Sequence, residues 1–257
     1  DIREIRQKTP PELEIEAFVH GAMCVSYSGR CLLSNYMTGR DSSRGACAQP
    51  CRYQYYLMEE KRPGEYFPVF EDNKGTYIMN SRDMCMIDHV AELMDAGLNS
   101  LKIEGRAKSA YYAAIVTGAY RHAIDAAAQG IPLDPVWRDE VEKVSHRHYS
   151  TGFYYGYPGQ FYEDSRYIRD WQVAAIVQDC TADGLATLSL RNKFKAGDEV
   201  ELVGPGCKPM AFAAPMMTDE EGNSLEEPKK PQMLFQMQLP HAVSPLSILR
   251  REVGLTP

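Results

Sequence analysis

The sequence has no apolar run of the length that crosses a membrane. A spanning helix needs about 18 consecutive apolar residues, and no stretch of the 257 residues reaches that length. The N-terminus, Asp1-Ile-Arg-Glu-Ile-Arg, also lacks the apolar segment of a secretory signal. We therefore expect a cytoplasmic protein without a membrane partner, in a reducing compartment where its seven cysteines remain thiolates.

The sequence also lacks the common motifs of hydrolases. It contains no HExxH zinc motif, no GxSxG nucleophile motif and no His/Asp pairing of evident triad type. The best remaining candidate for a peptidase is a Cys24/His20 dyad. The net charge of -7 argues against sequence-blind binding of nucleic acids, but the distribution of charge matters more than the sum. The acidic residues cluster at 219–227, far from the cysteine loop.

Four of the seven cysteines lie within 28 residues of one another. They are Cys24, Cys31, Cys47 and Cys51, with the spacing C-x6-C-x15-C-x3-C. Four thiolates from one loop suit a structural zinc or an iron–sulfur cluster. Structural zinc usually takes two tight C-x2-4-C pairs, and only the last two cysteines have that spacing, so the pattern favours iron–sulfur. Disulfides and buried core thiols are the remaining alternatives.

Hydrophobic periodicity predicts an α/β fold over residues 1–168. We expect a strand at 13–19, a cysteine-carrying loop at 20–56, a strand at 99–103, and helices at 82–96, 109–130 and 135–145. In the helix at 82–96, Ser81 is the expected N-cap, and the expected inward face consists of Met84, Ile87, Ala91 and Met94. Alternation of strands and helices is typical of a β/α (TIM-like) barrel.

From Trp171 onward the apolar residues recur with a period of two. We expect strands at 171–177, 185–190, 200–203, 232–238 and 245–249, joined by Gly, Asp and Pro turns. Residues 169–257 are therefore predicted to form a small antiparallel β-barrel domain. Residues 191–200 resemble, at the level of fold alone, the β-barrel that translation factors use against tRNA.

Aromatic residues crowd the junction before this domain: Tyr149, Phe153, Tyr154, Tyr155, Tyr157, Phe161, Tyr162 and Tyr167. They suit either stacking on unpaired bases or packing between domains, and packing is the commoner use.

A second polar motif follows the predicted strand at 99–103. Glu104 through Lys108 lie between the end of that strand and the next helix, a position that in a β/α barrel faces the same rim as the cysteine loop. Arg106, together with backbone N–H groups at Ser109, would hold a phosphate or a carboxylate. In the alternative, Glu104 and Arg106 form a structural ion pair with each other or with a neighbouring strand.

Histidines supply the remaining candidates for proton transfer. His20, just before the cysteine loop, is either an acid or base near the metal or a hydrogen-bonded structural residue. His146 and His148 flank Arg147 with a spacing that suits metal poorly, so we expect them at the surface or facing a phosphate.

Several segments together resemble the collagenase-like peptidase family U32. They are Glu16-Ala-Phe18-Val-His20-Gly21-Ala22-Met23-Cys24, Ser28-Gly29-Arg30-Cys31-Leu-Leu33-Ser34, Gly45-Ala-Cys47, Cys51-Arg52-Tyr53, Asn80-Ser81-Arg-Asp83 and Ser100-Leu-Lys102-Ile103-Glu104-Gly105-Arg106. Some members of this family were named as peptidases of unknown catalytic type. Others act in oxygen-independent or prephenate-dependent hydroxylation of tRNA, ribosomal RNA or a ubiquinone precursor, with a four-iron, four-sulfur cluster.

The resemblance implies roles for particular residues. Cys24, Cys31, Cys47 and Cys51 would hold the cluster, with Cys85 in reserve, since some members replace a local ligand with a later cysteine. His20, Glu104 and Arg106 would serve catalysis, and Arg106 and Lys108 would bind the anionic co-substrate, for which prephenate is the family's candidate, or an RNA phosphate. Because the resemblance begins near the last strands of a β/α barrel, we expect residues 1–168 to be its C-terminal portion and the first half to precede Asp1.

Three functions follow from these observations. The segments quoted above resemble most closely the branch of the family that acts on tRNA. This resemblance favours hydroxylation of a tRNA nucleobase, the wobble uridine. The alternatives are a collagenase-like peptidase and a zinc-clipped RNA-binding scaffold. A protein partner that supplies part of the site is compatible with each of them.

Overall fold

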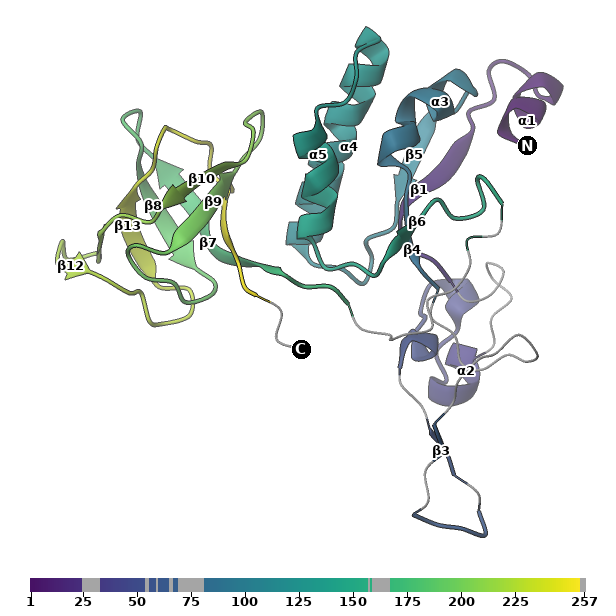
Figure 1. Cartoon of the computed structure of the whole chain (residues 1–257), viewed down its shortest axis with the longest axis horizontal. Helices are drawn as coiled ribbons and strands as arrows, with labels where there is room; N and C mark the ends of the chain where they lie inside the picture. Colours follow the sequence, from purple (N-terminus) through teal and green to yellow (C-terminus); the bar gives the residue numbers. More distant parts are fainter. Residues whose placement is uncertain are drawn as a thin grey trace. The chain divides into compact units, whose positions relative to one another are not determined.

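The computed structural model describes most of the chain as two compact units. The residues described are 1–24, 33–53, 56–58, 60–64, 67–68, 81–156, 158 and 167–254. Unit 1 comprises Asp1–Ala107 and His146–Ile168, and unit 2 comprises Lys108–Ser145 and Arg169–Pro257. The chain therefore enters unit 2, returns to unit 1 and then completes unit 2 (Figure 1).

Within the described residues, unit 1 is built on a mixed sheet with the strand order β5-β1-β4-β6. The strands are β1 (Glu16–Ala22), β4 (Asp83–Cys85), β5 (Ser100–Ile103) and β6 (Tyr149–Ser150). β1 pairs with β5 in parallel and with β4 in antiparallel orientation. The α/β class is thus confirmed, whereas the β/α barrel stays a prediction.

The other elements of unit 1 are short. They are the helices α1 (Ile2–Lys8), α2 (Leu33–Thr38) and α3 (Val90–Asp95), the 3₁₀ helices η1 (Ser42–Arg44), η2 (Pro50–Arg52) and η3 (Ile87–His89), and the strand pair β2 (Tyr56–Leu57) and β3 (Phe67–Pro68). The strand predicted at 13–19 is found three residues later, as β1. The region predicted as a loop at 20–56 begins inside β1 and contains α2, η1 and η2.

The helix predicted at 82–96 is wrong in its first half. Asp83–Cys85 form β4, Ser81 caps no helix, and the α-helix begins only at Val90. All three residues of β4 are buried, because β1 and β6 flank this strand. A short run buried on every side shows no strand alternation and cannot be told from a helix by its period. Gly97 does follow the helix, with a φ of 95°.

The face of α3 also differs from the prediction. Val90 and Leu93 are its buried residues, and Ala91 is exposed.

The two helices of unit 2 agree with their sequence signals. They are α4 (Ala110–Gln129) and α5 (Pro135–Glu140), which continues into η4 (Val141–Lys143). The Ser109 hydroxyl accepts a hydrogen bond from the amide of Tyr112 at 3.2 Å, as an N-cap does. Asp134 caps α5 in the same way, through the amide of Val136 at 3.1 Å. α4 and α5 lie side by side (Figure 1).

Residues 171–252 form a curled antiparallel sheet with the order β10-β9-β14-β7-β8-β13-β11-β12. The strands are β7 (Trp171–Cys180), β8 (Leu185–Leu190), β9 (Glu199–Val203), β10 (Met210–Ala213), β11 (Met217–Thr218), β12 (Ser224–Leu225), β13 (Leu234–Gln238) and β14 (Ile248–Glu252). The antiparallel β-domain predicted from the period of two is therefore present. Its core includes the fully buried Val177, Leu188, Phe235 and Leu249.

The strand predicted at 245–249 starts three residues later, as β14. β10, β11 and β12, which the sequence did not predict, contain two to four residues each. Runs so short carry little periodicity to detect.

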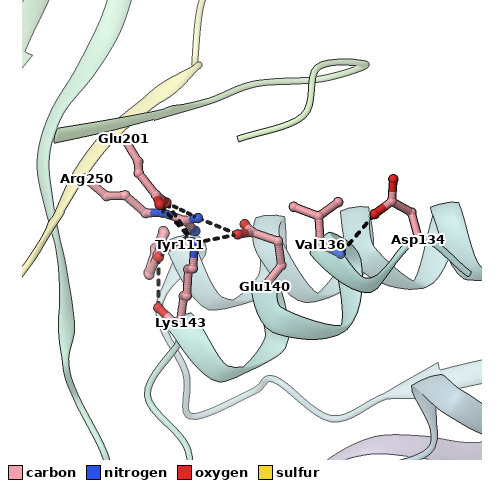
Figure 2. Close-up of polar contacts among 7 residues, drawn as sticks. All are labelled: Tyr111, Asp134, Val136, Glu140, Lys143, Glu201 and Arg250. Carbon is pink, nitrogen blue, oxygen red and sulfur yellow. Dashed lines mark hydrogen bonds and ion pairs between the residues drawn. The ribbon is translucent and has the colours of Figure 1, made fainter. Parts of the chain in front are cut away.

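A buried cluster of charges ties the helices of unit 2 to its sheet (Figure 2). Arg250 of β14 is fully buried, and its guanidinium donates to Glu140 of α5 at 2.5 Å and to Glu201 of β9 at 2.7 Å. It also donates to the hydroxyl of Tyr111 at 3.1 Å. Lys143 contributes a second cation, 3.0 Å from Glu201.

The cluster shifts the pKa of the groups that it contains. Burial raises the pKa of Tyr111 to about 12, although the nearby charge of Arg250 acts in the opposite direction. Burial alone would lower the pKa of Arg250, but its hydrogen bond to Glu140 and the adjacent charges outweigh burial and raise it.

We expect Arg250→Met to destabilise the protein by about 3–5 kcal/mol, because it leaves the carboxylate of Glu140 buried without its guanidinium partner. The matched control is Arg251→Met, which removes a partly exposed pair with Asp198 at 3.4 Å and should cost less than about 1 kcal/mol. Urea unfolding measures both values. Equal losses in the two variants would show that the buried cluster does not hold the helices on the sheet.

Candidate functional site

The residues around the end of β1 approach the loop after β5 very closely. The amide of Glu104 donates to the carbonyl of His20 at 2.8 Å. Gly21 has a φ of 127°, and a Cβ built on it would lie 2.5 Å from the carbonyl oxygen of Glu104. Such a contact leaves no room for a side chain. The His20-Gly21 pair therefore brings the two motifs into contact through the backbone.

Arg106 extends this contact to the cysteine loop. The Glu104 carboxylate accepts the amide of Arg106 at 3.0 Å, which shapes the turn after β5. The Arg106 guanidinium is exposed and lies against Gly45, where a Cβ would overlap Nη1. The guanidinium is thus placed two residues before Cys47, as expected if both motifs share one rim. The roles of Glu104 and Arg106 stay predictions.

The described cysteines of the loop form no disulfide with one another. Cys24 is exposed, and Cys47 and Cys51 are partly exposed; Cys31 lies outside the described residues. The Cys47 Sγ accepts the amide of Gln49 at 3.3 Å. Among the described residues, no three Cys, His, Asp or Glu side chains come close enough to hold a metal. With one of the four expected ligands not described, the metal set stays a prediction.

The other three cysteines lie elsewhere in the structure. Cys85 is buried on β4, opposite His20 in the strand register. Cys180 ends β7, and Cys207 follows β9 in unit 2.

The histidines do not all lie where the sequence suggested. His20 is 1% exposed, with its Nε2 3.4 Å from the hydroxyl of Tyr149. His146, predicted at the surface, is 2% exposed and stacks on Tyr149 with ring centroids 4.4 Å apart. The surface position was wrong, because Tyr149 of β6, which also packs on His20 of β1, covers the His146 ring. His148 is exposed, as expected.

Lys108 lies in unit 2 and is engaged there. Its Nζ donates to the carbonyl of Ser145 at 2.8 Å and lies 5.1 Å from the ring centre of Tyr112. Its proposed role in binding an anion has no support from these contacts.

Described aromatic residues near the junction form hydrogen bonds within unit 1. The Tyr154 hydroxyl donates to the carbonyl of Phe18 at 2.7 Å, and the Tyr155 hydroxyl bonds to Glu92. Phe153 is 67% exposed. Tyr157, Phe161 and Tyr162 lie outside the described residues.

A buried ion pair was not predicted from the sequence. Asp83 and Arg147 meet at 2.8 Å, with side chains 1% and 6% exposed. Arg147 lies two residues before β6, between His146 and His148, and this polar stretch gives no local signal of burial. The partner of Arg147 is 64 residues away, which local patterns do not reveal.

No helix among the described residues has the length and hydropathy needed to cross a membrane.

The arrangement is that of an α/β protein with a thiol-rich loop beside an exposed guanidinium, joined to a separate β-domain. The family model described as Peptidase family U32 matches residues 1–164. The family model described as Peptidase family U32 C-terminal domain matches residues 169–250. The chain belongs to peptidase family U32.

Curated relatives of the chain carry two kinds of name. The tRNA hydroxylation protein P1 of Bacillus subtilis is 34% identical, and the match covers 98% of this chain and 60% of the relative. The tRNA hydroxylation protein P of Escherichia coli is 39% identical, and the match covers 80% of this chain and 54% of the relative. A collagenase of Porphyromonas gingivalis is 35% identical over 56% of this chain and 34% of its own length. The chain thus spans a little over half of the tRNA hydroxylation proteins.

Among solved structures, the C-terminal domain of a putative U32 peptidase from Geobacillus thermoleovorans is 28% identical. The match covers 31% of this chain and 99% of that one, with a TM-score of 0.30.

We expect Gly21→Ala to destabilise the protein by about 3 kcal/mol, because the new methyl group would meet the backbone of Glu104 at a φ that side chains avoid. Gly39→Ala is the matched control, since Gly39 also has a positive φ, 69°, but no atom lies within 4 Å of the position that a Cβ would take there. That change should cost about 1 kcal/mol. Thermal unfolding compares the two, and a smaller loss in Gly21→Ala would contradict the close approach.

Proposed function

We propose that the chain is part of a cytoplasmic, iron–sulfur-dependent enzyme that hydroxylates a tRNA nucleobase, the wobble uridine. The observation that carries the proposal is the contact between Arg106 and the cysteine loop at Gly45, in a chain whose relatives include tRNA hydroxylation proteins. An anion-binding group and a set of thiols then serve one reaction centre. We further propose that the parallel pair β1 and β5 belongs to a β/α barrel.

The donor chemistry of the loop fits an iron–sulfur cluster. Cys24, Cys47 and Cys51 have access to solvent and form no disulfide with one another, and Cys31 would complete the four ligands. The hydrogen bond from the amide of Gln49 to the Cys47 sulfur is of the kind that tunes clusters in proteins. When bound, the cluster would supply electron transfer to the hydroxylation.

The protein side chains would bind and orient the reactants. Arg106 presents a fork of N–H donors that matches a carboxylate or a phosphate, so it would hold prephenate, the co-substrate implied by the family resemblance, or an RNA phosphate. Glu104 fixes the turn that carries Arg106, through the amide of Arg106. The burial of His20 favours its structural alternative, so the proposal assigns the substrate contact to Arg106.

A collagenase-like peptidase is the second candidate, because a collagenase is among the relatives. It would use Cys24 as a nucleophile, and one thiolate cannot both attack a peptide bond and ligate a cluster. The two functions therefore predict different metal contents.

We expect the full-length protein, purified without oxygen, to contain iron and acid-labile sulfide in near-equal amounts and to absorb broadly in the visible range, because four thiolates hold a cluster. Cys47→Ser should remove this absorbance. Cys85→Ser and Cys180→Ser should keep it, since Cys85 is packed on β4 and Cys180 lies in unit 2. Stoichiometric zinc without sulfide would support the zinc-clipped scaffold instead. If Cys85→Ser lost the absorbance and Cys51→Ser kept it, Cys85 and not Cys51 would be the fourth ligand.

We expect deletion of the gene to remove one oxygen atom from a single tRNA nucleoside, measured by mass spectrometry. Wild type should restore the modification. Arg106→Ala should lower it about tenfold or more while iron is retained, because the change removes a charge-assisted contact. Arg121→Ala, which removes an exposed arginine of α4, is the control and should restore it fully. Unchanged nucleosides, together with gelatin cleavage by protein free of contaminating proteases, would favour the peptidase.

A further inference from the structure

The Asp83–Arg147 pair joins β4 to the start of β6 in the interior of unit 1. The guanidinium donates from Nε to Asp83 Oδ1 at 2.9 Å, and its Nη2 lies 2.8 Å from the same oxygen. The amide of Arg147 donates to the other carboxylate oxygen at 3.1 Å. Asp83 thus fixes the side chain and the backbone of Arg147 together.

The same guanidinium extends to the chain that leaves β1. Its Nη2 lies 3.4 Å from the Ser81 hydroxyl and 3.5 Å from the carbonyl oxygen of Met23. The Ser81 hydroxyl donates to that carbonyl oxygen at 2.7 Å. β1 ends at Ala22. The carbonyl of Met23, the residue just before Cys24, is therefore bonded by these two side chains and, among the described residues, not by a neighbouring strand.

Stability alone does not explain this arrangement. A buried ion pair repays the cost of desolvating two charges only in part, and well-packed apolar residues often serve as well. What a guanidinium adds is direction, because its planar fork of donors holds several acceptors in fixed positions. Here the acceptors come from β4, from Ser81 and from the residue before the first cysteine.

We propose that Arg147 is a positioning residue, which, with Asp83 and Ser81, fixes the backbone of Met23 and hence the direction in which Cys24 leaves the sheet. With a side chain 6% exposed, Arg147 does not reach substrate. The link to a cluster ligand rests on the proposed function, whereas the hold on Met23 does not.

Hydrogen exchange of the metal-free full-length protein tests the hold on Met23. Amides of residues 22–24 should exchange about tenfold faster in Ser81→Ala, which loses one hydrogen bond, and at least as fast in Arg147→Met. Arg147→Lys should lie between wild type and Arg147→Met, because a lysine keeps the charge but not the fork. The control, Arg250→Met, removes a guanidinium that is buried even more completely, in unit 2, and should leave these amides unchanged. Unchanged exchange in Ser81→Ala, or equal acceleration in Arg250→Met, would overturn the proposal.

Cluster loss tests the consequence for Cys24. In anaerobic protein with an iron chelator, below the unfolding temperature of every variant, visible absorbance should decay about tenfold faster in Ser81→Ala than in wild type or Arg250→Met. If the decay rate of the absorbance depended only on the global stability of each variant, the proposal that Arg147 and Ser81 position Cys24 would be wrong. Wild-type protein without iron and sulfide would refute the proposed function instead, and hydrogen exchange would then decide the positioning of Met23 by itself.

Discussion

The close approach of Gly21 to Glu104 is the constraint on which the rest of unit 1 depends. Because Gly21 has no side chain, the end of β1 and the turn after β5 meet through their backbones. That contact fixes where Glu104 points, and Glu104 in turn fixes the amide of Arg106. The guanidinium of Arg106, in the turn after β5, thereby reaches Gly45 in the cysteine loop that follows β1.

The sequence predicted best the features that depend on neighbouring residues. Ser109 and Asp134 cap their helices because capping requires only the next two or three amides. β4 was missed because its burial comes from strands far away in the sequence. His146 was misplaced for the same reason, since Tyr149, which covers its ring, also packs on His20 of β1. The thiol spacing and the polar motif after β5 were visible, and both motifs were expected at one rim, but the sequence did not show that they meet at Gly45.

Buried arginines have the same role in both units. Arg147 joins β4, β6 and the end of β1, and Arg250 joins α4, α5 and two strands of the β-domain. In each case the guanidinium bonds to several elements at once. An apolar side chain of similar volume could contact the same elements, but it would not fix their directions. Their partners lie 64 and 110 residues away along the chain. Local sequence patterns therefore present both arginines as ordinary surface charges.

The burial of His20 bears on the choice between the two activities named among the relatives. A cysteine peptidase needs a base that meets both the thiol and the solvent-borne substrate, and a ring with 1% exposure meets no such substrate. Cys85 of β4 is paired with His20 in the strand register, and the ring centroid of Tyr149 lies 5.2 Å from that of His20, which gives His20 a place in the packing of the sheet. Cysteines that bind a metal need no neighbouring base that is open to solvent, because their thiolates bind the metal directly. An exposed Cys24 and a buried His20 therefore lack the shared exposure that a cysteine–histidine dyad needs.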